Sequence, residues 1–370
     1  MFEIIERACT FSEFEKTKID YAIFRLHYIF TAGLLFIFFV IVTTFQVAGN
    51  PLACESSDEK IIDAIPTYCW IHSTFVIPKA FYKDVPEEIA HPGIDSTQNP
   101  KKFRYITYYQ WVYFMLFFQA VSFYIPRWLW KTWEGGKMKT LTKGLNNSLL
   151  PGQKLDEEFE ALSRYLVKTL GAHDAYAAKY YLCELLSLLN IVAQFFLLDI
   201  FFSGQYIDFG VRIIEFYTSE SYHRQNKNGT YYIKGNPMLI LFPRVSKCIY
   251  RAFGSTSLIE VQDVICILTL NVINEKIYIF LWFWFVILGI LTVMSIIIDF
   301  FLIISWCTRL WTLQARFYLV DNKDFRVLVR KGSFGDWLLL DLIGRNINHV
   351  VFRNLMSDVA SKMTEYYRKL

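Results

Sequence analysis

Residues 108–130 decide how this chain is organised. Their sequence is Tyr-Tyr-Gln-Trp-Val-Tyr-Phe-Met-Leu-Phe-Phe-Gln-Ala-Val-Ser-Phe-Tyr-Ile-Pro-Arg-Trp-Leu-Trp. As a helix, the part from Tyr108 to Ile125 would rise about 27 Å, close to the thickness of the hydrocarbon layer of a bilayer. Tyrosine and tryptophan stand at both ends, and these side chains favour the boundary between membrane and water. The stretch therefore predicts a membrane span with an aromatic anchor at each end. The alternative, a buried helix of a large soluble core, is disfavoured by three similar segments elsewhere.

The composition of the whole chain supports the same interpretation. Of its 370 residues, 54% are hydrophobic and 19% are charged, and the charged share lies below the roughly 25% of soluble domains. The net charge of +4 is small and dispersed, so nucleic acid is not an expected partner. The first apolar run begins behind a charged head and is too long for the apolar part of a signal peptide. We expect it to stay in the protein as a signal-anchor span.

Four apolar segments of helical length predict four transmembrane helices. These are 28–48, 108–126, 180–203 and 277–299, and they separate a head (1–27), three loops (49–107, 127–179 and 204–276) and a tail (300–370). All 38 Lys and Arg fall outside the four segments. The head, the middle loop and the tail hold 24 of them. Positive charge favours the cytoplasmic side, so both termini and the middle loop are expected there.

The cysteines indicate which loops meet oxidising conditions. Cys54 and Cys69 lie in the first loop, and Cys248 and Cys266 lie in the third. Disulfides persist outside the cytosol, and four cysteines allow three connectivities. Bridges between the loops would join them into one cap, whereas two bridges within the loops are the alternative. The residues alone leave both open. A metal site is not expected, because no Cys-x-x-Cys occurs and His72 lacks further ligands at a suitable spacing.

The expected fold class is an all-α polytopic membrane protein, a four-transmembrane-helix subunit with a helical cytoplasmic dome. The family resemblance given below adds a disulfide-stapled extracellular cap that contains some β structure. Helical periodicity runs from Leu155 to Lys179, and residues 334–345 of the tail form an amphipathic run. Apolar residues repeated along the tail favour burial in a packed dome; a gating or assembly platform is the alternative.

Two further polar features bear on function. Glu184 and Asp199 lie in or at the ends of the third segment, and we expect them at the two membrane interfaces, because a charge at bilayer depth is costly. Asn228-Gly229-Thr230 is a glycosylation sequon, usable only if its loop faces the secretory lumen. The chain has no Gly-x-Ser-x-Gly, His-Glu-x-x-His or P-loop motif, so neither an enzyme nor a bound cofactor is expected.

Several short motifs are shared with one known family. They are Tyr108-Tyr109-Gln110-Trp111-Val112, Tyr68-Cys69-Trp70-Ile71, Phe123-Tyr124-Ile125-Pro126-Arg127, Trp133-Glu134-Gly135-Gly136, Asn274-Glu275-Lys276-Ile277, Leu281-Trp282-Phe283-Trp284-Phe285 and Gly335-Asp336-Trp337. In these motifs the chain resembles the innexins, the invertebrate gap-junction proteins, and its combination is similar to the insect branch. The likeness runs from about Phe24 to Asn348. One departure is Gly49-Asn50-Pro51, where the family usually has Gly-Asp-Pro.

The resemblance implies a gap-junction channel in the plasma membrane. An octameric ring of subunits would surround a wide pore and dock with the ring of a neighbouring cell, and ions and small metabolites would pass. The implied partners are copies of this chain, other innexins and membrane lipid. The implied disulfides are Cys54–Cys266 and Cys69–Cys248.

The resemblance also suggests which residues line the pore. The amino-terminal segment would fold into the pore and the first span would line it, which makes Phe2, Glu3, Glu6, Glu13 and Thr31 the candidates. A ring of these glutamates would create a negative field, so we expect a mild preference for cations.

Two other classes of four-span protein are alternatives to a gap-junction channel. A pannexin-like channel that does not pair cells is the alternative function, because a glycan on Asn228 at the docking face would block pairing. An adhesion organiser of the tetraspanin type would need Cys-Cys-Gly in the larger loop, and the chain lacks that motif.

Overall fold

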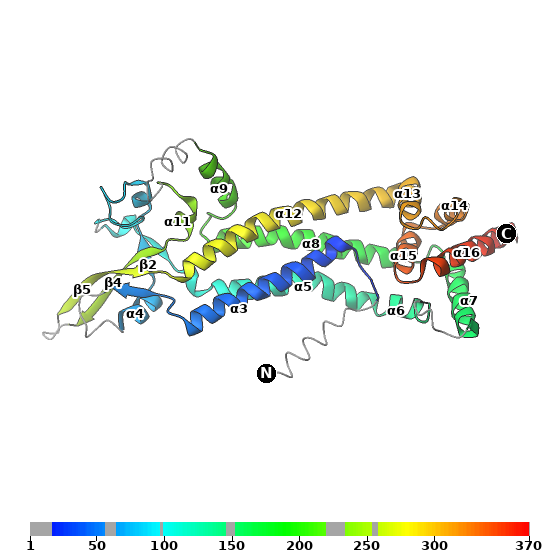
Figure 1. The fold of residues 1–370 in the computed structure, drawn as a ribbon, viewed down its shortest axis with the longest axis horizontal. Helices are drawn as coiled ribbons and strands as arrows, with labels where there is room; N and C mark the ends of the chain where they lie inside the picture. Colours follow the sequence, from blue (N-terminus) through cyan, green and yellow to red (C-terminus); the bar gives the residue numbers. More distant parts are fainter. Residues whose placement is uncertain are drawn as a thin grey trace. The chain divides into compact units, whose positions relative to one another are not determined.

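The computed structural model describes residues 17–55, 64–96, 99–145, 152–219, 234–253 and 258–369, and within them the chain is mostly helical (Figure 1). The chain divides into two compact units. Unit 1 comprises residues 1–28, 124–189 and 290–370, and unit 2 comprises residues 29–123 and 190–289. Each unit is described by itself.

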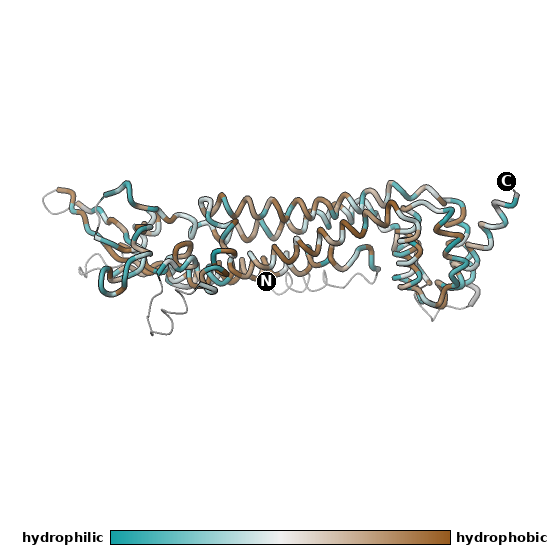
Figure 2. The backbone as a smooth tube through the Cα atoms, turned by 90° about the horizontal axis from the view of Figure 1, so that it is seen from above, coloured by the Kyte–Doolittle hydropathy of each residue, from teal (hydrophilic) through white to brown (hydrophobic). Residues whose placement is uncertain are grey.

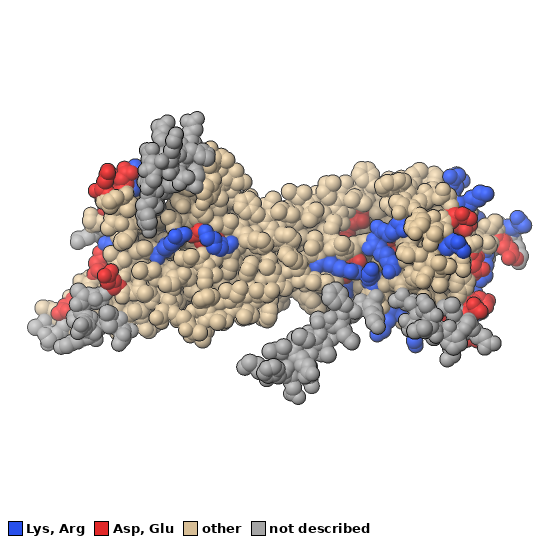
Figure 3. All heavy atoms as spheres, viewed as in Figure 1, with Lys and Arg blue, Asp and Glu red and all other residues tan. Residues whose placement is uncertain are grey.

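Four long helices supply residues to both units. The first is continuous from Ala22 to Ala48 and consists of α2 (Ala22–Arg25), the π-helical turn η1 (Leu26–Thr31) and α3 (Ala32–Ala48). The others are α5 (Val112–Glu134), α8 (Asp174–Phe201) and α12 (Leu270–Ile304). Apolar residues run along them in Figure 2, and charged side chains are sparse over their surface in Figure 3. All four extend beyond the segments predicted from the sequence at one end or both.

Among the described residues, three helices are long and apolar enough to cross a membrane, judged by length and composition. They are Ala22–Ala48, Asp174–Phe201 and Leu270–Ile304. Helix α5, which contains most of the stretch 108–130, is not one of them. Its tyrosines, tryptophans, Gln119 and Arg127 lower its mean hydropathy, although it stays helical through Pro126.

Unit 2 contains a five-stranded antiparallel sheet with the order β1-β5-β4-β2-β3. Its strands are β1 (Ala53–Glu55), β2 (Thr74–Val76), β3 (Arg104–Ile106), β4 (Val245–Phe253) and β5 (Ile259–Ile267). The neighbouring elements are α4 (Ala64–His72), η2 (Pro78–Tyr82), η3 (Pro100–Lys102), η4 (Tyr108–Gln110), α9 (Phe209–Thr218) and α11 (Pro237–Leu241). The two long strands form a hairpin, and the short strands that flank it come from a stretch about 200 residues away in the sequence. The sequence predicted some β structure but none of this pairing.

Unit 1 contains the shorter helices α6 (Lys137–Leu141), α7 (Gly152–Lys168), α13 (Trp306–Arg316), α14 (Asn322–Lys331), α15 (Phe334–Gly344) and α16 (His349–Lys369). Its apolar core gathers around α15, whose Leu338, Leu339, Leu342 and Ile343 are completely buried. Full burial of such side chains contributes about 1.5–3 kcal/mol each to the free energy of folding.

One prediction about unit 1 was wrong. The run 334–345 is not amphipathic, because every residue from Gly335 to Gly344 is buried; its two aspartates have partners inside the unit. The helical periodicity from Leu155 to Lys179 corresponds to two helices, because α7 ends at Lys168 and α8 begins at Asp174. Gly171 lies in the break with φ +82°, a conformation that favours glycine.

Gly335 provides a test of how tightly α15 is packed. A Cβ atom on Gly335 would lie 2.2 Å from the backbone carbonyl carbon of His173. We expect Gly335→Ala to destabilise the protein by about 1–3 kcal/mol through overpacking, measured as a lower thermal unfolding midpoint of the purified protein in detergent. Gly289→Ala is the control, because its Cβ would meet nothing closer than 3.8 Å. Equal midpoints for the two variants would contradict the packing described here.

Candidate functional site

Two disulfides join the two parts of the sheet in unit 2. The antiparallel pairing of β1 with β5 places Cys54 opposite Cys266, and their sulfur atoms are 2.06 Å apart. Cys69 of α4 is bonded to Cys248 of β4 with a sulfur–sulfur distance of 2.08 Å. These are the same two pairs that the family resemblance implies. Each bond links the chain that follows the first long helix to the chain that precedes the last.

The remaining sulfur chemistry does not suggest a metal site. The sulfur atoms of Cys54, Cys69 and Cys266 lie within 4.8 Å of one another, so the two disulfides are adjacent. Metals bind thiolates, whereas all three of these sulfurs are already in disulfide bonds, Cys54 with Cys266 and Cys69 with Cys248. Among the described residues, Cys183 and Cys307 are free, the first buried and the second exposed. Cys9 lies outside the described residues.

The signature residues 108–112 hold the start of α5 against the disulfide-bearing helix α4. The Tyr109 hydroxyl donates a hydrogen bond to the carbonyl oxygen of Cys69 at 3.3 Å, and the Gln110 amide donates to the carbonyl oxygen of Trp70. The rings of Trp70 and Tyr109 have centroids 4.7 Å apart. Tyr108 donates to the carbonyl oxygen of Leu241 in α11 at 2.9 Å.

The last two signature residues differ in exposure. Val112 is completely buried, whereas Trp111 is 57% exposed. Four of the five residues therefore fix α5 to its surroundings within unit 2, and Trp111 presents an aromatic side chain to the surface.

The predicted pore-lining residues are mostly beyond what the structure describes. Phe2, Glu3, Glu6 and Glu13 lie outside the described residues, as does the sequon residue Asn228. Thr31 is described and is completely buried in the single chain; its hydroxyl accepts a hydrogen bond from the Trp284 indole at 3.0 Å. This contact directs Thr31 toward a neighbouring helix of unit 2 and does not favour a place on a pore wall.

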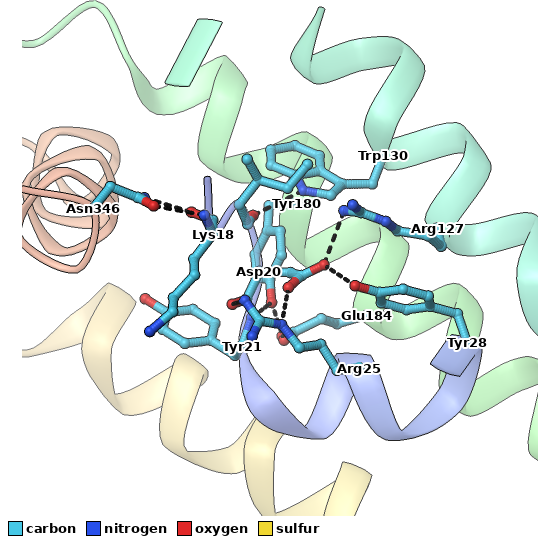
Figure 4. A network of polar contacts seen from close by, with 11 residues as sticks. Lys18, Asp20, Tyr21, Arg25, Tyr28, Arg127, Trp130, Tyr180, Glu184 and Asn346 are labelled. Carbon is cyan, nitrogen blue, oxygen red and sulfur yellow. Dashed lines mark hydrogen bonds and ion pairs between the residues drawn. The ribbon is translucent and has the colours of Figure 1, made fainter. Parts of the chain in front are cut away.

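Unit 1 contains a buried ionic cluster centred on Asp20, which is 2% exposed (Figure 4). Its carboxylate accepts hydrogen bonds from Arg25 Nε at 2.6 Å, from an Arg127 guanidinium nitrogen at 2.9 Å and from the Tyr28 hydroxyl at 2.8 Å. The Arg127 guanidinium also lies 4.8 Å from the centroid of the Tyr28 ring. The carboxylate thus has three donors, two of them cationic, which is the condition for burying a charge at tolerable cost.

Backbone contacts fix the residues on both sides of Asp20. The Trp130 indole donates to the carbonyl oxygen of Ile19 at 3.0 Å. The Asn346 side chain exchanges two hydrogen bonds of 2.6 Å with the backbone of Lys18. On the other side, the backbone N–H of Tyr21 donates to the Tyr180 hydroxyl at 3.2 Å. The segment 18–21 is therefore held by α5, by α8 and by the end of α15.

A second buried carboxylate, Asp341, extends this cluster. It accepts hydrogen bonds from the Tyr21 hydroxyl at 2.9 Å and from Arg316, and it forms an ion pair with Arg345 at 3.0 Å. Burial raises the pKa of Tyr21 well above its ordinary value, and the charge of Asp341 raises it further. Tyr21 is thus a permanent hydrogen-bond donor.

A third carboxylate, Asp336, begins α15. It forms a capping box with Ser333, lies 2.8 Å from His173 Nδ1 and accepts the backbone N–H of Gly171 at 2.7 Å. Burial alone would raise the pKa of Asp336, but the hydrogen bonds from His173 and from the N–H groups of Ser333 and Gly171 lower it below its usual value.

The sequence alone does not identify the partners of these aspartates, and in it Arg127 is only a basic residue at the end of a predicted span. The available signal is that Asp20 and Arg25 stand directly before an uncharged run and that an arginine follows Pro126 in an apolar helix. That signal marks groups that need partners, but it does not say which residues the partners are.

Comparison with known proteins gives one family. A family model described as Innexin matches residues 20–363. The chain is 41% identical over 347 residues to Innexin shaking-B of Drosophila melanogaster, covering 94% of this chain and 91% of that protein. It is 36% identical over 371 residues to Innexin inx1 of Schistocerca americana, covering 98% of each. It is 34% identical over 365 residues to Innexin inx2 of Drosophila melanogaster, covering 98% of this chain and 96% of that protein.

The disulfide connectivity can be tested by cutting the chain. A protease site inserted after Lys143, in the turn that follows α6, separates Cys54 and Cys69 from Cys248 and Cys266. On a denaturing gel, we expect the two fragments to migrate together without reductant and to separate when reductant is added. Both disulfide bonds cross the cut and would hold the fragments together. A control with Cys54→Ser and Cys69→Ser should separate without reductant. Separation of the unmodified fragments without reductant would indicate bridges within each loop.

The Asp20 cluster predicts an order of stability for three variants. Asp20→Asn leaves Arg127, 9% exposed, buried without its carboxylate, and loss of such a partner costs about 3–5 kcal/mol. Arg127→Gln should cost less, because Arg25 and Tyr28 still bond Asp20. Arg25→Gln should cost about 1 kcal/mol or less, because Arg25 is 33% exposed. Thermal unfolding of the detergent-purified variants measures the order, and an equal loss for all three would refute it.

Proposed function

This chain belongs to the innexin family, and from that premise we propose how its two units build a channel. Innexins are gap-junction channel proteins of invertebrates. The chain is accordingly a gap-junction channel subunit and not an enzyme. The proposal concerns its topology, its docking surface and its assembly.

We propose four membrane spans, with α5 as the second. Besides the three helices that qualify by composition, α5 presents apolar side chains to the surface: Phe118 is 63%, Ile125 52% and Trp128 59% exposed. Exposed side chains of this size along a helix suit a lipid environment and would be unfavourable in water. The loops 49–107 and 204–276 then lie outside the cell. The head, the loop 127–179 and the tail 300–370 lie in the cytoplasm, as the charge distribution predicts.

The observation that carries the proposal is the pair of disulfides that joins the two outer loops. Such bonds are maintained on the oxidising side of a membrane. Each loose residue that must be ordered on docking costs roughly 1–2 kcal/mol of backbone entropy. A sheet whose strands are cross-linked before docking avoids much of that cost, which suits a cap that must meet a second cap in register.

The β4–β5 hairpin supplies the apolar part of this docking surface. Phe253 pairs with Ile259 in the register, and Val261 follows on the same face of β5. These side chains are 80%, 64% and 62% exposed. An exposed apolar face of this kind on a hairpin is suited to contact with another protein surface. We assign that contact to a second copy of the chain.

The assembly follows from the family. We propose an octameric ring in the plasma membrane that docks with a ring of the neighbouring cell and can include other innexins. The head, with Phe2, Glu3, Glu6 and Glu13, would enter the pore and give a mild cation preference. The Asp20 cluster would hold the base of this head in a fixed position. The alternative is a pannexin-like channel that does not pair cells, motivated by a glycan on Asn228.

Paired-cell recording tests the docking function. Cells that express the chain should show junctional current, and Val261→Asp should reduce it by at least tenfold, because a buried unpaired carboxylate is unfavourable at an interface. Gln262→Asp adds the same charge on the opposite face of β5 and is the control. Currents through undocked channels should persist in both variants.

The pannexin-like alternative predicts a different result in the same recordings. If pairs of wild-type cells carry no current and pairs expressing Asn228→Gln do, the glycan blocks docking and the pannexin-like function is supported. Junctional current from the wild-type chain would rule out that alternative.

A further inference from the structure

Helix α14 in unit 1 carries a stripe of cations along one face. Positions separated by three and four residues lie on the same side of a helix, and here they are Lys323, Arg326, Val327, Arg330 and Lys331. The opposite face is formed by Phe325, Leu328 and Val329, which are buried in the core of unit 1. The four cations are exposed and, together with Asn322 and Val327 of the same helix, line the open surface groove of α14.

Three of the four cations in this stripe are not neutralised by a carboxylate among the described residues. By contrast, most buried or half-buried arginines of unit 1 have a carboxylate partner, as Arg127 has Asp20 and Arg345 has Asp341. Within the part of the chain that the structure describes, Lys323, Arg326 and Arg330 form no ion pair. Asp321 and Asp324 lie at the start of the same helix, and they leave a net positive charge on α14.

The stripe is tied to the end of a membrane helix. The Arg330 guanidinium carbon lies 5.7 Å from the centroid of the Trp306 ring. Trp306 begins α13 and is separated from the end of α12 by Ser305 alone. Trp306 and Trp311 are 41% and 69% exposed, and exposed tryptophans beside a span favour the membrane–water boundary. In the proposed topology, the Trp306 contact would bring the Arg330 end of α14 near the cytoplasmic end of α12.

We propose that the α14 groove binds the phosphate headgroup of an anionic phospholipid, with Trp306 and Trp311 in the adjoining interface. Clusters of basic residues next to a span bind the anionic lipids of the cytoplasmic leaflet. Lys and Arg gather on the surface of the part of unit 1 that carries α13 and α14 (Figures 1 and 3). The physiological placement rests on the proposed topology, in which unit 1 faces the cytoplasm.

A lipid fits this site better than a soluble polyanion does. In the proposed topology the groove lies close to the bilayer surface, where headgroups are already concentrated, and its aromatic neighbour Trp306 can contact the start of the acyl chains. The small net charge of the whole chain, +4, gives no general attraction to polyanions.

The test measures lipid binding to the full-length protein in neutral detergent micelles. The probe is dioctanoyl phosphatidylinositol bisphosphate, with dioctanoyl phosphatidylcholine as the neutral lipid, and binding is followed by thermophoresis. One basic residue at an anionic surface contributes about fivefold to affinity. The triple variant Lys323→Gln, Arg326→Gln, Arg330→Gln should therefore bind the anionic lipid at least tenfold more weakly than the wild type, with an unchanged thermal midpoint because all three residues are exposed.

A matched triple variant removes the same charge elsewhere in unit 1. Arg164→Gln, Lys168→Gln, Arg353→Gln changes exposed residues of α7 and α16 and should bind like the wild type. An equal loss in both triple variants, or wild-type binding by the α14 variant, would overturn the site. Inositol trisphosphate binding as tightly as the lipid would also overturn it, in favour of a soluble ligand. Because the assay uses micelles, its result does not depend on docking between cells, so the two proposals fail separately.

Discussion

Two covalent bonds between distant stretches of chain are the constraint on which unit 2 depends. They join residues 212 and 179 positions apart in the sequence. In a chain-entropy model, each disulfide that closes a loop of this length lowers the conformational entropy of the unfolded chain and so stabilises the fold by about 5 kcal/mol. The gain is smaller where membrane helices already restrict the unfolded chain. Strands β1 and β2 have three residues each and α4 has nine. Elements this short are not stable alone, so the disulfides hold β1 and α4 on the β4–β5 hairpin.

Unit 1 reaches rigidity by different chemistry. Its two described cysteines, Cys183 and Cys307, are unbridged. In place of covalent bonds it has an apolar core around α15 and two buried carboxylates, Asp20 and Asp341, each with cationic partners. Removing the central carboxylate of such a cluster leaves the buried guanidinium of Arg127 without its counter-charge. The geometry of the segment before the first long helix therefore depends on this electrostatic pairing.

The parts of this fold that the sequence could predict are those governed by local periodicity. Uncharged apolar runs indicate helices, because burial or lipid contact of such a run needs no information about distant residues. The sheet could be anticipated only as some β structure, since its register pairs Ala53 with Ile267 and Phe75 with Lys247. The same limit explains the error at α15. Asp336 and Asp341 look like a polar face, and their partners outside the helix, His173 and Arg316, help to make burial tolerable. The burial of Asp20 could not be predicted for the same reason, because its partner Arg127 is distant in the sequence.

The signature at residues 108–112 connects the two kinds of constraint. Tyr109 and Gln110 are bonded to the backbone of Cys69 and Trp70, next to a disulfide, and they stand directly before α5. Further along the same helix, Arg127 is bonded to Asp20. One helix therefore begins at the covalent cross-links of unit 2 and carries a partner of the ionic cluster of unit 1. The aromatic and amide side chains of the motif reach backbone carbonyls of the neighbouring element α4 and thereby attach the start of α5 to it.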